Sequence, residues 1–313
     1  MGRFDDLATQ PRRGPRDILR WKLGDPLTGR HEPRPPDARA LDQVRPGVRD
    51  REAAAAALAR PEAALTWLGH ATFALRLGGQ LVLTDPVLCA RIQGVVARLT
   101  PPGVAVDRLP PVDVVTVSHD HMDHMDYWSL RRLPRDALYL VPLGNGARLA
   151  PLGLRHVVEL DWWQTHRHGT LEITLVPARH WSMRMPWTRN QTLWGGFVYR
   201  GPEGVAYHSG DTAFGPHYGE IGARTGRIDW AMLPIGAYSP RWFMEPQHQN
   251  PEEAGEGFLA LGARLLVAMH WGTFKLTDEP IGEPPARLRA WWAARALPAE
   301  RLWIPDIAER RVL

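Results

Sequence analysis

Short apolar runs separated by glycine, proline and aspartate fill the chain from Leu65 onward. The run VDVVTVS (112–118) has the length and the β-branched composition of a buried strand. The segment LTWLGHATFALRLGG (65–79), followed by QLVLTDPV (80–87), predicts a hairpin that turns at Gly78-Gly79. By the same criteria we expect further strands at residues 137–142, 156–160, 171–178, 194–200, 204–211, 230–236 and 264–270.

Several of these strands alternate with helical patterns, at residues 125–133, 216–226, 250–261 and 283–297. The third helix has clear start signals, because Asn250 suits the N-cap, Pro251 suits the first helical position, and two glutamates follow. Hairpins combined with alternating strands and helices predict an α/β (α+β) fold. We expect an αββα sandwich of two mixed β-sheets with helices on the outer faces.

Residues 1–62 differ from the rest and predict an N-terminal arm. They are rich in arginine and proline, and their one clear element is an Ala-rich helix at 51–60 that Pro61 stops. Residues 63–313 then form a single catalytic domain. The arm either wraps this domain or contacts a membrane or a partner through apolar residues, namely Ile18, Leu19, Trp21 and Leu23.

Composition excludes several classes of protein. No apolar run reaches the roughly 18–20 residues of a membrane span. The N-terminus lacks the apolar core of a signal peptide, so we expect a cytoplasmic protein, or one held peripherally at a membrane surface. The net charge is only +4 and Lys/Arg-dense stretches are missing, which argues against a nucleic-acid partner. The single cysteine, Cys89, allows neither an internal disulfide nor a cysteine-based zinc site.

The highest density of potential metal ligands lies in HDHMDHMD (119–126), directly after the apolar run 112–118. A histidine pair in a loop is usually solvated surface, but four potential ligands within six residues after a buried strand predict a metal site. A tight strand-to-helix turn would bring the four together, whereas a regular helix or strand would not. These ligands are His119, His121, Asp123 and His124.

Three other predicted strands end in a potential ligand, namely His180, Asp211 and His270. One such residue would more often be structural, but three of them complement the cluster, because strand ends are where sites assemble in layered α/β folds. Five histidines and two aspartates suit two divalent metal ions, and we expect Zn²⁺. Since no Ser-His-Asp or Cys-His nucleophile is evident, a metal-bound hydroxide is the natural attacking group.

The HxHxDH motif, with later His, Asp and His residues, resembles the metallo-β-lactamase superfamily of dinuclear hydrolases. The resemblance implies the αββα fold and two metal ions that share Asp211 as a bridging ligand. One ion would be held by three histidines, and the other by an aspartate and two histidines. The two sets are His119, His121 and His180, and Asp123, His124 and His270.

Longer blocks, such as TWLGHATFAL (66–75), LPIGAYSPRWFM (233–244) and MHWGTF (269–274), resemble the N-acyl-phosphatidylethanolamine-hydrolysing phospholipase D family. This similarity implies a zinc-dependent phosphodiesterase that releases phosphatidic acid and an N-acylethanolamine from a phospholipid. Met122 departs from the tyrosine expected there in the animal enzymes. The alternative is a metal-dependent hydrolase of a small soluble ester, lactone or cyclic phosphodiester. A metal-free scaffold is disfavoured because all seven ligands are present, and a homodimer is a further expectation.

Residues around the ligands receive supporting roles. Asp85 is expected to hydrogen-bond a ligating histidine, unless it only forms a turn before Pro86, and His70 is expected to be structural or to support a ligand. The resemblance assigns four substrate-binding candidates, Tyr238, Arg241, Gln247 and His248. The alternatives for Arg241 and His248 are a surface arginine and a histidine beside a helix. We expect Asp123, Asp211 and His248 to be the catalytic residues. The remaining histidines are expected to be non-catalytic: His31, His156, His166, His168, His208 and His217.

Overall fold

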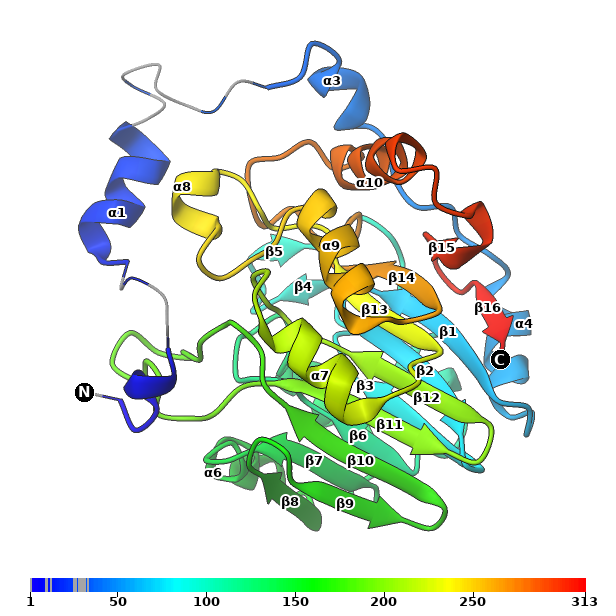
Figure 1. Ribbon diagram of the computed structural model, residues 1–313. Helices are drawn as coiled ribbons and strands as arrows, with labels where there is room; N and C mark the ends of the chain where they lie inside the picture. The colour runs from blue at the N-terminus through cyan, green and yellow to red at the C-terminus, as the bar shows by residue number, and fades with distance from the viewer. Residues whose placement is uncertain (1, 9–10, 12, 25–26, 28–31, 33) are drawn as a thin grey trace.

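The computed structural model describes residues 2–8, 11, 13–24, 27, 32 and 34–313, so that His31 lies outside the described residues. In this part of the chain two seven-stranded sheets pack face to face around a shared core (Figure 1). The side chains of Thr116 in one sheet and Tyr199 in the other share a buried hydrogen bond of 2.7 Å. The predicted pair of mixed sheets is confirmed.

The first sheet combines antiparallel hairpins with parallel strands. Strand β2 (Thr72–Leu77) meets β3 (Gln80–Thr84) at Gly78 and Gly79, whose φ angles of 57° and 74° suit the predicted tight turn. Strand β3 then pairs in parallel with β6 (Val114–Thr116), which leads into the histidine cluster. The sheet order is β16 (Arg310–Val312), β1 (Ala64–Gly69), β2, β3, β6, β7 (Leu138–Pro142) and β8 (His156–Leu160).

The second sheet is antiparallel on one side and parallel on the other. Its strands β10, β12, β13 and β14 run in the same direction, so their carboxyl ends meet at one edge. This edge receives the three predicted ligands that lie outside the histidine cluster. The order is β15 (Leu302–Trp303), β14 (Leu265–Met269), β13 (Trp230–Pro234), β12 (Gly204–His208), β11 (Gly196–Gly201), β10 (Leu171–Val176) and β9 (Thr165–His168).

Three helices lie together over the second sheet in Figure 1, namely α7 (His217–Thr225), α9 (Pro251–Leu261) and α10 (Glu283–Ala294). Helix α9 begins as predicted, because Asn250 and Glu253 form a capping box with backbone-to-side-chain hydrogen bonds of 2.8 and 2.9 Å. Among the described residues, no helix has both the length and the apolar character that crossing a bilayer requires. Shorter helices are α4 (Arg51–Leu58), α5 (Tyr127–Leu130), α6 (Gly146–Leu149) and α8 (Arg241–Met244).

The structure corrects several sequence predictions. The expected strand 65–79 is broken at His70, which adopts a φ of 56° in a turn between β1 and β2. The helix expected at 125–133 shrinks to α5, because residues before Asp126 form a turn and Asp126 caps the helix through the Ser129 amide. Several short or polar strands were not predicted, namely β9, β15, β16 and the hairpin of β4 (Arg91–Ile92) and β5 (Val96–Ala97).

The arm holds more regular structure than the single predicted helix. Besides α4, it contains η1 (Asp5–Leu7), α1 (Pro15–Leu19), η2 (Arg20–Gly24) and α3 (Ala38–Leu41). These segments are each five residues or fewer, too short for a periodic apolar pattern to reveal them. Phe4 and Leu58 of the arm pack into the shared core.

Candidate metal centre

Strand ends and one tight turn bring the predicted ligands to a single place. Strand β6 leads into His119, and residues 119–126 then turn sharply before α5. Strands β10, β12 and β14 lead into His180, Asp211 and His270. All seven predicted ligands lie in two adjacent groups, within each of which the potential ligand atoms are no more than 4.8 Å apart.

The first group contains His119, His121, His180 and Asp211. His121 Nδ1 lies 2.9 Å from His119 Nε2 and 3.2 Å from His180 Nε2. Asp211 Oδ2 lies 3.9 Å from each of these Nε2 atoms. Three imidazole nitrogens and one carboxylate oxygen form a donor set typical of a site for one borderline divalent ion.

The second group contains His70, Asp123, His124 and His270. Asp123 Oδ2 lies 3.1 Å from His70 Nε2, and 3.6 Å from the Nε2 atoms of both His124 and His270. The latter two Nε2 atoms are 3.3 Å apart. His70, expected to be structural or to support a ligand, hydrogen-bonds Asp123 and lies within the group itself.

Asp211 lies between the two groups. Its Oδ2 atom, which faces the first group, is also 3.1 Å from His124 Nε2. Its Oδ1 atom is 3.1 Å from His270 Nε2 in the second group. This is the position that a bridging ligand needs, although the bridging role itself stays a prediction.

The polar atoms of the centre fit a bound cation better than they fit one another. His121 Nδ1 faces two imidazole nitrogens at 2.9 and 3.2 Å, and a neutral imidazole nitrogen carries at most one proton to share with them. His121 Nε2 and His248 Nδ1 are buried without a hydrogen-bond partner. Burial, reinforced by the neighbouring imidazoles, holds the pKa of His119 well below its usual value, which favours the neutral form that ligates metals.

The carboxylates supply the matching negative charge. Burial alone would raise the pKa of Asp211, but His124, His270 and His248 lie beside it and hold that pKa well below its usual value. Burial would likewise raise the pKa of Asp123, but the neighbouring histidines, His124 above all, hold it well below its usual value. Two ionised carboxylates buried among imidazoles attract a divalent cation.

Asp85 supports ligands of both groups, which agrees with its predicted position. Its Oδ2 atom lies 2.7 Å from His124 Nδ1. Asp85 Oδ1 accepts a 2.6 Å hydrogen bond from the Ser118 amide, and Oδ2 accepts one of 2.6 Å from the Ser118 hydroxyl, which lies 2.9 Å from His119 Nδ1. Such contacts fix the orientation and tautomer of a metal-binding imidazole. Ser118 was not predicted as a site residue, and the one sequence signal for it is its position directly before His119.

Met122 lies in a small apolar cluster beside the centre. It packs with Val87, Cys89, Ile92 and Phe274. Phe274 in turn meets the ring of His70 edge-on, with 5.3 Å between ring centroids. Burial raises the pKa of the Cys89 thiol to about 12, so this cysteine is an inert apolar group, as expected.

Two substrate-binding candidates reach the centre from the substrate-side loop, which we define as residues 237–249. The backbone carbonyl of Gln247 lies 2.9 Å from His180 Nδ1. The ring of His248 lies 5.0 Å from that of His180, and its Nδ1 atom is 4.0 Å from Asp211 Oδ2. Gln247 therefore approaches the centre through its backbone, and His248 through its side chain.

The other two candidates point elsewhere. The Tyr238 hydroxyl donates a 2.6 Å hydrogen bond to Glu283 Oε1. The Arg241 guanidinium donates to both carboxylate oxygens of Glu253, at 2.9 and 3.1 Å. The structure does not bring these two side chains to the ligand groups, and their contacts with substrate stay predictions.

A two-sheet sandwich with His/Asp groups at its strand ends defines the class of metal-dependent hydrolases. The profile of the beta-lactamase superfamily domain matches residues 80–271, a range that includes all seven predicted ligands, from His119 to His270. The chain belongs to the beta-lactamase superfamily, with the metallo-β-lactamase fold.

Individual relatives agree with this placement. An uncharacterized protein of Mycobacterium tuberculosis is 44% identical over 238 residues, which are 72% of this chain and 63% of that protein. The chain therefore spans less than two thirds of the length of this relative. N-acyl-phosphatidylethanolamine-hydrolyzing phospholipase D 1 of Caenorhabditis elegans is 36% identical over 74% of this chain and 70% of its own length. A metal-dependent hydrolase of Pyrobaculum aerophilum is 30% identical over 72% of this chain and 92% of its own.

Proposed function

We propose that this protein is a dinuclear, zinc-dependent phosphodiesterase of the phospholipase D type that acts on N-acyl-phosphatidylethanolamine-like lipids. The observation that carries the proposal is the position of Asp211 between two groups of buried histidines and aspartates. Two such sites sharing one carboxylate suit the hydrolysis of a phosphodiester, in which both the attacking and the leaving oxygen need stabilisation.

The first ion would be held by His119, His121 and His180, and the second by Asp123, His124 and His270, with Asp211 shared. Bound there, the ions would lower the pKa of a water molecule and neutralise charge on the phosphoryl oxygens. The chain's own residues fix this arrangement. Asp85 holds His124 directly and His119 through Ser118, while the Gln247 carbonyl holds His180.

His248 is the chain's candidate for handling the leaving group. Its Nδ1 atom is buried, has no hydrogen-bond partner and lies 4.0 Å from Asp211 Oδ2. Burial lowers the pKa of His248 to about 3, which leaves the imidazole neutral at pH 7. A neutral imidazole in this position would donate an N–H hydrogen bond that orients and stabilises the departing alkoxide.

The similarity to the phospholipase D of Caenorhabditis elegans supports a lipid as the substrate, and the arm offers a surface for lipid contact. Ile18, Leu19 and Leu23 are 50%, 58% and 54% exposed, while Trp21 packs inward against Phe243. Exposed apolar side chains on a helix with neighbouring cations suit peripheral binding to an anionic membrane. Replacing Leu19 and Leu23 together by serine should then weaken cosedimentation with phosphatidylglycerol vesicles.

Metal analysis combined with product identification tests the proposal. The purified protein should contain about two zinc ions per chain and should release phosphatidic acid from an N-acylated phosphatidylethanolamine. Cleavage of soluble diesters or lactones without cleavage of the lipid would transfer the assignment to a small-molecule hydrolase. A protein without bound metal after purification in chelator-free buffer would contradict the proposal.

A further inference from the structure

A cavity of about 540 Å³ lies between the arm and the substrate-side loop. Its five basic side chains are each paired with an acidic group of the chain, so its charges are already neutralised. The cavity therefore offers little attraction to a charged ligand. Two of these ion pairs, Lys22–Asp278 and Lys275–Asp42, connect the arm to the segment 275–278. These basic residues are Lys22, Arg34, Arg241, Lys275 and Arg287.

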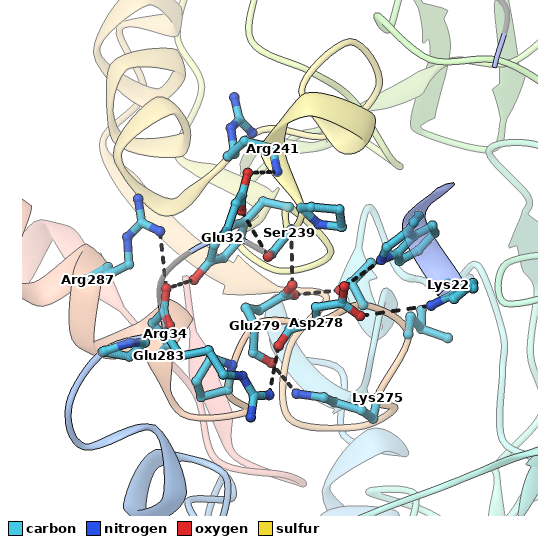
Figure 2. A pocket seen from close by; sticks show the side chains of 17 residues that line it. Lys22, Glu32, Arg34, Ser239, Arg241, Lys275, Asp278, Glu279, Glu283 and Arg287 are labelled. Carbon is cyan, nitrogen blue, oxygen red and sulfur yellow. Dashed lines mark hydrogen bonds and ion pairs between the residues drawn. The ribbon is translucent and has the colours of Figure 1, made fainter. Parts of the chain in front are cut away.

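Glu32 makes the most direct connection from the arm to the loop. Figure 2 shows its carboxylate between Ser239 and Arg241. One oxygen accepts a 3.1 Å hydrogen bond from the Ser239 hydroxyl, and the other accepts a hydrogen bond from the backbone N–H of Arg241. A single arm residue thus binds both the Ser239 side chain and the Arg241 backbone at the start of α8.

Arg241 extends the connection to the end of the loop. Its Nη2 atom donates to both oxygens of Glu253 at the start of α9. Its Nη1 atom donates a 3.1 Å hydrogen bond to the backbone carbonyl of His248. The guanidinium therefore ties the first part of the loop, next to Glu32, to the residue that reaches the metal centre.

Aromatic contacts attach the same part of the arm to α8. The rings of Trp21 and Phe243 lie 4.9 Å apart between centroids. The guanidinium carbon of Arg20 lies 4.1 Å from the ring centroid of Trp242, and Arg13 donates a hydrogen bond to the Trp242 carbonyl. The arm therefore contacts the loop along the whole of α8 and not at Glu32 alone.

We propose that Glu32 and Arg241 are positioning residues, through which the arm fixes the loop conformation that places His248 and the Gln247 carbonyl at the metal centre. Neither side chain touches the ligand groups, so both act through the loop. The inference deepens the proposed function and rests on the centre being hydrolytic. It gives the arm a role in the reaction that its sequence, rich in arginine and proline, does not suggest.

Hydrogen–deuterium exchange and kinetics on the full-length, metal-loaded protein test the proposal. Glu32→Ala should speed exchange of amides in residues 237–249, the Arg241 amide above all. It should also lower kcat by about tenfold, the scale of a lost supporting contact, while metal content stays at the wild-type level. Glu32→Gln keeps an acceptor oxygen and should restore most of both properties.

The matched control is Glu52→Ala, which removes another arm glutamate paired with an arginine. Glu52 lies 3.1 Å from Arg108 on the surface, away from the loop. Loop exchange and kcat in Glu32→Ala that equal those of Glu52→Ala would overturn the proposal. If Glu32→Ala folds poorly, Arg241→Lys, which retains the charge facing Glu253, should show the same localised exchange. Exchange needs no substrate, so it tests the inference even if every lipid and soluble diester proves inert and the proposed function fails.

Discussion

The metal centre and the cavity beneath the arm are both lined by charged and polar side chains, but they satisfy these groups differently. In the cavity each basic group meets an acid of the same chain, for example Arg287 with Glu252 at 2.8 Å. In the centre, imidazole nitrogens face other imidazole nitrogens, and His121 Nε2 and His248 Nδ1 have no partner. Buried polar groups without partners are costly and therefore indicate a missing ligand, whereas paired ones indicate structure. Removing a ligand from the centre should therefore abolish most metal binding and activity. Removing a paired side chain at the cavity should mainly change the order of the loop or the stability, with a smaller effect on kcat.

The largest effect should follow from His121→Ala. The change removes a ligand of the first group, and lost metal stabilisation of several kcal/mol corresponds to a fall in kcat/KM on the order of 10³-fold. Metal content per chain and kcat/KM on an N-acylated phospholipid provide the measurement. His156→Ala, at an exposed position in β8, is the control and should retain both values. A His121→Ala protein with full metal content and full activity would refute the assignment of this ligand.

A smaller effect is expected from Asp85→Asn. The amide keeps the size of the side chain but loses the charge that orients His124 and, through Ser118, His119. Metal affinity or kcat/KM should fall about 10–100-fold, measured by competition with a chelator and by kinetics. Asp113→Asn is a matched control, because Asp113 accepts a 2.7 Å hydrogen bond from the Leu81 amide but touches no ligand. Equal losses in both variants would show that the effect is structural.

The contrast between centre and cavity also explains what the sequence could predict. Each of the seven ligands follows an apolar strand or lies in one dense motif, so their types and positions are visible without a structure. The two sheets and the turn at Gly78-Gly79 were accessible for the same reason, because apolar runs and glycine pairs are local signals.

The arm and its contacts could not be predicted, because they depend on pairings between distant residues. Glu32 and Arg241 are 209 positions apart and resemble ordinary surface charges in the sequence. The turn that breaks the strand at His70 was missed because apolar residues continue on both sides of it. Arg241 was predicted to face substrate, whereas the structure shows its guanidinium bound to Glu253 and the His248 carbonyl.

Metal binding at the centre should also depend on pH. Burial would lower the pKa of His270, but Asp211 and Asp123 outweigh it and raise that pKa to about 9 in the metal-free protein. His270 is therefore protonated at pH 7 and must release this proton to bind a cation. Metal affinity should rise with pH up to about 9, by at most about tenfold per unit for each displaced proton. Calorimetric titration with zinc in two buffers of different ionisation enthalpy measures the release, and binding without proton release would contradict this account.

The smallest effect should come from Asn250→Ala, which removes a structural contact near the loop. Asn250 caps α9, and its loss should lower the free energy of unfolding by about 1 kcal/mol, measured by urea denaturation of the metal-loaded protein. The substitution also removes the acceptor of the Glu253 backbone amide, although the ion pair between Glu253 and Arg241 remains. Because that ion pair connects to the loop and not to the ligands, metal content should not change and kcat should fall less than in Glu32→Ala. A loss of metal in Asn250→Ala would mean that the cap and the centre are coupled more tightly than the hydrogen bonds between them indicate.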